Sequence, residues 1–204
     1  MTGRWPDAMV RCRTTDVGGT RALAGAVAGL CVPGDIVLLA GDLGAGKTAF
    51  AQGFGAALGV EEPITSPTFA LLRQYPCDYG AIRTLLHADV YRLDHLQEVV
   101  DLGLGELVED GGVAVVEWGD VAEPVLGSGS LTVHIVADPA ASDPAGADPA
   151  ASDPVGASAA GAGDAMAAAA DENARSIAVA PIGTAWDGRS TRLATALAPW
   201  AVPA

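Results

Sequence analysis

Residues 41–48 read GDLGAGKT, and they follow the short apolar run DIVLLA at 35–40. The segment matches the phosphate-loop pattern G-x-x-x-x-G-K-[ST], whose four fixed places are filled by Gly41, Gly46, Lys47 and Thr48. Lys47 is the sole lysine of the chain, beside ten arginines. Because an ammonium is a compact point charge and a guanidinium is a broad planar fork, a lysine at this one place favours phosphate binding over a plain glycine-rich turn.

The neighbouring sequence supplies the context that such a loop needs. The run at 35–40 is typical of a buried parallel strand, and 48–58 has a composition compatible with a helix. Glycines let successive N–H groups face phosphate oxygens, and the helix N-terminus adds partial positive charge. We therefore expect the phosphates of a nucleotide to contact the loop and the residue after it: Gly41, Asp42, Leu43, Gly44, Ala45, Gly46, Lys47, Thr48 and Ala49.

Two acidic residues stand at the ends of apolar strands. Glu117 ends the run VAVV at 113–116, and Asp89 ends the weaker run LLHA at 85–88. The carboxyl ends of parallel strands share one edge of a sheet with a phosphate loop, so both acids are candidates for serving Mg²⁺ and the attacking water. The alternative for each is a solvated turn residue. Direct and water-mediated metal contact use the same residue types, so neither acid is singled out.

Three other features lie near these candidates. Ser66-Pro67-Thr68 offers two hydroxyls on a proline-stiffened segment, which is typical both of a switch that senses the γ-phosphate and of a simple turn. Trp118 follows Glu117 and is suited to stacking on a base, to a partner surface or to the core. The histidines are scattered at positions 87, 95 and 134, and they predict no metal cluster.

Composition and charge limit the classes of function. A chain of 204 residues predicts one domain, and an aromatic content of 5% predicts a core built mainly from Ala, Val and Leu. The net charge of −14 argues against a broad nucleic-acid or anionic-membrane surface. No signal segment is apparent, and the apolar run at 22–32 is too short to span a membrane. We expect a soluble, cytoplasmic protein with three reduced thiols, Cys12, Cys31 and Cys77.

Hydrophobic periodicity predicts the remaining elements. Helices are expected at 20–30, at 97–107 as one or two short pieces, and at 189–197. Within 131–136 apolar and polar residues alternate, which predicts a half-exposed strand. Further strands are expected at 69–75, 84–89, 113–117 and 176–180.

A different kind of sequence separates the last two strands. ADPAASDPAG at 137–146 and ADPAASDPVG at 147–156 form a near-perfect tandem repeat. The whole segment 137–174 holds seven acidic residues and neither Lys nor Arg. Because it lacks large apolar side chains and its Asp-Pro pairs break helix and sheet, we expect a disordered insert at the tip of a hairpin. A single folded domain would then comprise 1–136 and 175–204.

Four motifs follow one another along the chain: GDLGAGKT at 41–48, TSPTF at 65–69, HADVYRL at 87–93 and VEWGD at 116–120. Together they resemble the motifs of the TsaE family, bacterial P-loop ATPases required for threonylcarbamoyladenosine in tRNA. The resemblance covers roughly residues 14–136, and 175–197 looks like the closing strand and helix of the family. It implies an α/β fold of the P-loop NTPase type, a three-layer sandwich with a mixed, mostly parallel sheet. It also implies that the protein binds ATP with Mg²⁺ and hydrolyses ATP slowly. The implied partners are TsaB and TsaD, and contact with tRNA would then occur only through the complex with them.

The resemblance assigns the catalytic roles by position. Lys47 is expected to hold phosphate, and Thr48 to hold Mg²⁺. Asp89 and Glu117 are expected to serve the metal and the attacking water. The catalytic set implied by the family is therefore Lys47 with the two acids.

The same resemblance extends to residues around the nucleotide. Thr68 is expected in the switch-like segment that contacts ATP, and Trp118 beside the nucleotide or the partner surface. Two positions depart from the family: Ala49 stands where a second threonine is frequent, and Ala88 where an aromatic residue is common. Neither departure removes a ligand, so altered packing or altered adenine contacts are expected instead of lost chemistry.

Two other functions stay open on the sequence. A small-molecule kinase shares the loop but usually has a basic lid, and arginines after the loop are sparse, at 73, 83, 92 and then 175. A nucleotide-gated binding module would bind ATP without significant turnover. A GTPase is disfavoured, because its guanine-reading N-K-x-D motif needs a lysine and the sole lysine lies in the loop.

Overall fold

The computed structural model describes residues 9–67, 69–93, 95–138 and 173–203. Within these ranges no helix is long and apolar enough to cross a membrane. The strands are β1 (Val10–Thr14), β2 (Ile36–Ala40), β3 (Leu72–Tyr79), β4 (Ile82–Asp89), β5 (Gly112–Glu117), β6 (Leu131–Ala137) and β7 (Arg175–Pro181). The helices are α1 (Val17–Ala28), α2 (Lys47–Ala57), α3 (Leu96–Asp101), α4 (Leu104–Glu109), α5 (Gly119–Leu126) and α7 (Ser190–Leu197), with 3₁₀ turns η2 (Asp187–Arg189) and η3 (Ala198–Trp200).

The strands form one sheet of order β1-β7-β6-β2-β5-β4-β3. Its centre is parallel, because β6, β2, β5 and β4 all run the same way. Its edges are antiparallel: β3 pairs with β4, and β7 and β1 follow β6 on the other side. The central strands have the near-continuous apolar composition that burial on both faces requires, as in IVLLA of β2. The predicted mixed α/β sheet is confirmed.

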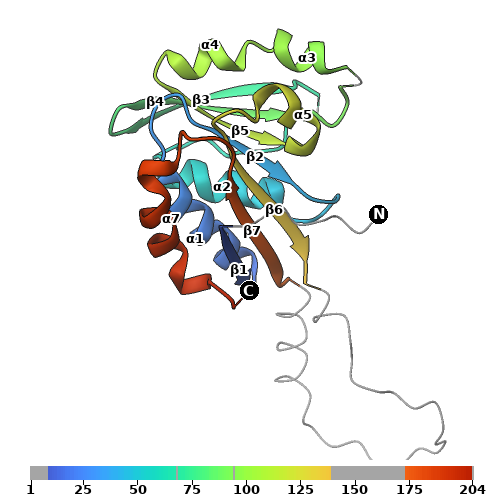
Figure 1. Ribbon diagram of the computed structural model, residues 1–204. Coiled ribbons are helices and arrows are strands. Elements are labelled where there is room, and N and C mark those ends of the chain that lie inside the picture. The colour runs from blue at the N-terminus through green and yellow to red at the C-terminus, as the bar shows by residue number, and fades with distance from the viewer. Residues whose placement is uncertain (1–8, 68, 94, 139–172, 204) are drawn as a thin grey trace, which may run out of the picture.

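Helices cover both faces of this sheet (Figure 1). The helices α1, α2 and α7 lie on one face, and α3, α4 and α5 lie on the other. Alternate residues of β2 supply two separate cores, since Val37 and Leu39 pack with Phe50 and Phe54 of α2, whereas Leu38 belongs to the core on the α5 side. The three-layer sandwich expected for a P-loop NTPase is confirmed.

Two elements have no counterpart among the predicted ones. The strand β1 reads VRCRT and is only five residues long, so its alternation of buried and half-buried residues is a weak signal. The helix α5 contains Pro124, and its first turn follows β5 without an intervening polar loop. A short arginine-bearing edge strand and a proline-containing helix both lack the composition that predicts such elements.

The strand β3 begins later than the predicted range of 69–75. Leu71 has a left-handed φ of 62°, and its N–H donates to the carbonyl of Pro67 at 2.7 Å, so a turn continues up to the strand. Pro76 is tolerated inside β3 because the strand lies at the edge of the sheet, and the pairing shifts register between Pro76 and Tyr79.

The strand β6 is more buried than its alternating sequence predicted. It lies between β7 and β2, and the side chains of Leu131, Val133 and Ile135 pack in the core on the side of α1, α2 and α7. Thr132 is buried and His134 is half-buried. Burial lowers the pKa of His134, although the negative charges of Asp120 and Glu123 in α5 oppose that shift. The predicted alternation is confirmed from Val133 to Val136, where buried and partly exposed residues alternate, but Thr132 at the start of the strand is buried as well.

The strands β6 and β7 form the predicted hairpin. They pair from Leu131 with Pro181 to Ala137 with Arg175, and the N–H of Asp138 donates to the carbonyl of Ala174 at 3.1 Å. Ala137 therefore belongs to β6, although the insert was expected to begin there. Residues 139–172 lie outside the described residues, so the predicted disorder and the division into domain and insert stay predictions.

A buried ion pair fastens the start of α7 to the entry of β2. Both arms of the Arg189 guanidinium contact the Asp35 carboxylate, with Nη2 2.8 Å from Oδ1, and Asp35 is 5% exposed. The guanidinium also lies 4.0 Å from the centroid of the buried Trp186 ring. Because both charges lie largely out of water, removing one leaves the other uncompensated.

We expect Asp35→Asn to lower the free energy of unfolding by about 3 kcal/mol. Urea denaturation followed by circular dichroism measures the change. The matched control is Asp78→Asn, which breaks the ion pair of Asp78 with Arg83, where the aspartate side chain is 90% exposed. That control is expected to cost less than about 1 kcal/mol. Equal losses for the two variants would show that burial does not set the strength of the Asp35 pair.

Candidate nucleotide-binding site

The predicted phosphate loop connects β2 to α2 at the carboxyl end of the parallel strands. Gly46 precedes α2 with a φ of 110°, a left-handed conformation that favours glycine. Among the described residues no side chain caps this helix start, so the N–H groups of its first turn suit an anion. Gly41 is required for a different reason: a Cβ there would lie 2.1 Å from the carbonyl oxygen of Ile135 in β6.

Lys47 lies inside the loop and is 5% exposed. Its Nζ donates to the carbonyls of Gly41 and Asp42 at 2.7 and 2.9 Å, and lies 3.8 Å from the centroid of the Trp118 ring. Burial lowers the pKa of this ammonium, and nearby carboxylates, led by Glu117, oppose the shift. Since the acceptors of Lys47 are neutral carbonyls, an anionic phosphate oxygen would form a stronger, charge-assisted hydrogen bond with it.

Glu117 is the centre of a hydrogen-bonded row of side chains. The Thr48 hydroxyl donates to Glu117 Oε1 at 2.9 Å, and His87 Nε2 lies 3.0 Å from the same oxygen. His87 is fully buried and Glu117 is 3% exposed. With a proton on Nε2, the ring of His87 donates to the carboxylate, so the row orients Glu117 toward the start of α2.

Asp89 lies beside Glu117, because the two residues are paired in the register of β4 with β5. The Ser66 hydroxyl donates to Asp89 Oδ2 at 2.7 Å, and the N–H of Tyr91 donates to Oδ1 at 3.1 Å. Asp89 is 4% exposed. Both carboxylate oxygens are thus positioned by neighbours, and Ser66 links the acid to the hydroxyl-bearing segment.

Trp118 is half-buried and packs against the core on the side of α3, α4 and α5. Its backbone has a φ of 62°, which costs a non-glycine residue roughly 1 kcal/mol. The Tyr91 ring lies 4.6 Å from the Trp118 ring, centroid to centroid, and the Lys47 ammonium lies over the same indole. The strained backbone therefore places an aromatic wall beside the loop.

One cavity of about 410 Å³ brings these features together. Of the predicted ATP contacts, Gly41, Asp42 and Ala45 do not line it, and Thr68 lies outside the described residues. Its walls are Leu43, Gly44, Gly46, Lys47, Thr48, Ala49, Ser66, Asp89, Tyr91, Glu117 and Trp118. Loop, acids and aromatic wall therefore converge on a single space.

Three residues at the site were not among the predicted ones. His87 was not assigned to the site, yet it lies two residues before Asp89 on β4. Residues two apart on a strand share one face of the sheet, and that signal identifies His87. Ser66 was recognised as part of the hydroxyl-bearing segment, but only Thr68 was assigned to the nucleotide. Tyr91 comes after the end of β4, where sequence periodicity carries no directional information.

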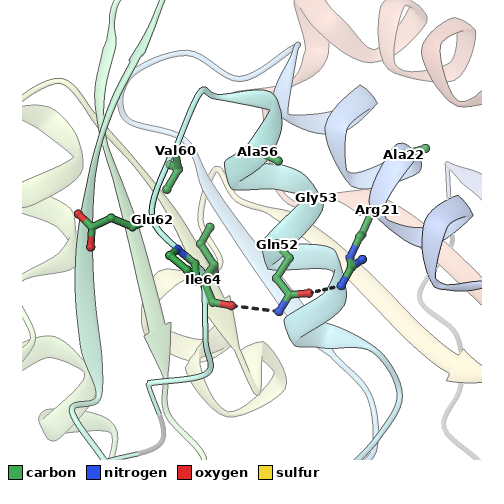
Figure 2. Close-up of a pocket in the computed structure, with 9 residues that line it drawn as sticks. Arg21, Ala22, Gln52, Gly53, Ala56, Val60, Glu62 and Ile64 are labelled. Atoms are coloured by element: carbon green, nitrogen blue, oxygen red, sulfur yellow. Dashed lines mark hydrogen bonds between the residues drawn. The ribbon is translucent and has the colours of Figure 1, made fainter.

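A second cleft, of about 560 Å³, lies between α1, α2 and the segment 60–64 (Figure 2). Arg21 donates to the side chain of Gln52 at 2.7 Å, and Gln52 donates to the carbonyl of Ile64 at 3.0 Å. These bonds tie the two helices to the segment that leads to Ser66. The lining of this cleft contains neither the loop glycines nor the two strand-end acids, so the smaller cavity is the candidate nucleotide site.

A parallel-centred sheet with this loop between β2 and α2 and an acid at the end of the adjacent strand defines a protein of the P-loop NTPase-like fold class. Within that class the chain belongs to the TsaE family. A family model described as "Threonylcarbamoyl adenosine biosynthesis protein TsaE" matches residues 14–143.

Curated relatives and a solved structure agree with this assignment. Proteins named "tRNA threonylcarbamoyladenosine biosynthesis protein TsaE" from Bacillus subtilis and Treponema pallidum are 39% and 40% identical over 126 residues, which is 62% of this chain and 77% and 90% of those proteins. The protein of the same name from Streptomyces coelicolor is 42% identical over 126 residues, which is 61% of this chain and 82% of that protein. The crystal structure of Bacillus subtilis YdiB superposes with a TM-score of 0.60 at 28% identity, over 93% of this chain and 94% of that one.

Proposed function

We propose that the protein is a Mg²⁺-dependent ATPase of the cytoplasm that serves the threonylcarbamoyladenosine modification of tRNA. One observation carries the proposal: the Thr48 hydroxyl of the loop donates to Glu117 at 2.9 Å, with Lys47 and Asp89 on the walls of the same cavity. Phosphate-binding and acidic groups thus lie around one cavity. The biosynthetic role rests on membership of the TsaE family.

Phosphate binding falls to the loop and to Lys47. Gly46, Lys47, Thr48 and Ala49 at the start of α2 line the cavity. The N–H groups of the first turn of a helix suit phosphate oxygens. Lys47 exchanges its contacts with the Gly41 and Asp42 carbonyls for the β- and γ-phosphates. Because its Nζ already lies at the loop, this exchange needs a small movement of the side chain only.

The donor set at the cavity fits Mg²⁺. This ion prefers oxygen ligands and is usually held by one or two carboxylates together with phosphate oxygens and water. The hydroxyl of Thr48 and the carboxylates of Glu117 and Asp89 all line the cavity. When bound, Mg²⁺ neutralises charge on the phosphates.

The attacking water is oriented by the same pair of acids. Glu117 is held by Thr48 and His87, and Asp89 is held by Ser66 and the backbone of Tyr91. Fixed carboxylates lose little entropy when they accept a hydrogen bond from water. The rings of Trp118 and Tyr91 form one wall of the cavity beside these acids.

We also propose that TsaB and TsaD are the partners of the protein, and that it contacts tRNA only indirectly, through these partners. Support comes from the family and from the net charge of −14, which disfavours direct binding to an anionic polymer. An ATPase that uses its energy on partner proteins does not need a basic surface of its own.

Phosphate release from Mg-ATP, measured for the protein alone and then with the TsaB–TsaD pair of the same organism, tests the proposal. Slow turnover alone and a clear rise with the pair are expected. Phosphate that appeared on a small acceptor instead of in solution would favour a kinase. ATP binding without turnover in either condition would favour a gated binding module.

A further inference from the structure

The β6–β7 hairpin contacts the phosphate loop through one side chain. Arg175, the first residue of β7, donates from Nε to the carbonyl of Ala45 at 2.8 Å, and its Nη2 lies 3.5 Å from the carbonyl oxygen of Gly44. Its Nη1 donates to the carbonyl of Ala174 at 2.8 Å. The guanidinium therefore joins the end of the hairpin to two successive peptide groups of the loop.

Peptide planarity gives this contact a consequence for the opposite side of the loop. In a trans peptide the C=O and the following N–H point in opposite directions. The carbonyl of Ala45 points at Arg175, so the N–H of Gly46 points away from Arg175, and Gly46 lines the candidate nucleotide cavity. Fixing one face of this peptide group thus fixes the donor on the other face.

The loop backbone is also held from within, since Lys47 Nζ donates to the carbonyls of Gly41 and Asp42. The side chain of Leu43 at its tip is 89% exposed, and among the described residues no side chain caps α2 at Gly46. Ala45 is buried, and its N–H donates to the carbonyl of Asp42 at 3.1 Å within the loop. Arg175 supplies the contact from outside the loop, with a positive charge that strengthens the hydrogen bond to the carbonyl.

We propose that Arg175 is a positioning residue for the phosphate loop, which holds the Ala45–Gly46 peptide in the orientation that presents the Gly46 N–H to a bound phosphate. The proposal rests on the proposed function, because it concerns the same nucleotide site. Arg175 acts through the loop and does not touch the nucleotide. The alternative is that Arg175 only closes the hairpin through Ala174.

ATP-binding titrations distinguish a role in positioning the loop from a role in closing the hairpin. A fluorescent ATP analogue, and then ATP itself, is titrated into Arg175→Ala, Arg175→Lys and the wild type. Arg175→Ala is expected to weaken ATP binding about tenfold, the effect of losing one charge-assisted hydrogen bond that orders the site. Arg175→Lys keeps a charged donor and is expected to recover part of the loss. The matched control is Arg192→Ala, which removes an exposed arginine of α7 and is expected to bind as the wild type does.

Melting temperature and steady-state kinetics accompany each titration. A rise in KM for ATP with a smaller change in kcat, at a melting temperature close to that of Arg192→Ala, supports the proposal. Wild-type affinity in Arg175→Ala would overturn it, as would a loss of binding that only followed a loss of stability in both Arg175 variants. If the wild type itself did not bind ATP, the proposed function would fail first and this inference with it.

Discussion

Replacing Lys47 with alanine is expected to weaken ATP binding by about 100-fold. The ammonium is the only lysine charge in the chain, and it is already held at the loop by the Gly41 and Asp42 carbonyls at 2.7 and 2.9 Å. A hydrogen bond to a charged group contributes about 1.5–3 kcal/mol, and each 1.4 kcal/mol is a factor of about ten in affinity. Loss of the contacts to two phosphates therefore removes most of the affinity. Isothermal titration calorimetry with ATP measures it.

Lys47→Arg is the informative companion. It keeps the positive charge but replaces a compact ammonium with a broad planar group, in a position where the side chain is 5% exposed and an indole lies 3.8 Å away. An intermediate affinity is expected, because charge is retained and fit is not. Melting temperatures of both variants check that the fold persists. Wild-type affinity in Lys47→Ala would remove the loop from the nucleotide site.

The part of the site that sequence predicts is the part that is local in the chain. The loop, its preceding strand and its following helix are contiguous, so a fixed spacing of Gly, Lys and Thr specifies their geometry. The acids Asp89 and Glu117 are also predictable, since each ends an apolar run and parallel strands bring such ends to one edge. The pairing of these two acids in register follows from the same sheet.

The part that sequence does not predict depends on contacts across long separations. Ser66 lies in the loop after α2 and donates to Asp89 at the end of β4, a contact that no sequence periodicity predicts. Arg175 contacts the loop across 130 residues of chain, through a hairpin whose register only the sheet defines. The burial of Thr132 in β6 was not predicted for a related reason, because an alternating pattern describes one strand and not the elements that pack on it.

Replacing Glu117 with glutamine is expected to lower ATP turnover about 100-fold or more while ATP affinity changes only a few-fold. Glutamine preserves the shape of the side chain and can still accept from Thr48, which donates to Glu117 at 2.9 Å. What it loses is the negative charge, on which Mg²⁺ binding and the orientation and deprotonation of water both depend. Phosphate release at saturating Mg-ATP, with a parallel binding titration, separates turnover from affinity.

Glu123→Gln is the matched control, because Glu123 lies on the exposed side of α5 and undergoes the same chemical change away from the cavity. It is expected to turn over ATP as the wild type does.

In Glu117→Gln the Mg²⁺ concentration that gives half-maximal activity should rise, which a purely structural role of this residue does not predict. Full turnover in Glu117→Gln, at an unchanged Mg²⁺ requirement, would remove Glu117 from the catalytic set. A large loss of melting temperature with unchanged Mg²⁺ dependence would instead make Glu117, which is 3% exposed and bonded to His87, a structural acid of the sheet. The separation of turnover from binding therefore decides whether the row from Thr48 through Glu117 to His87 is a catalytic assembly or part of the core.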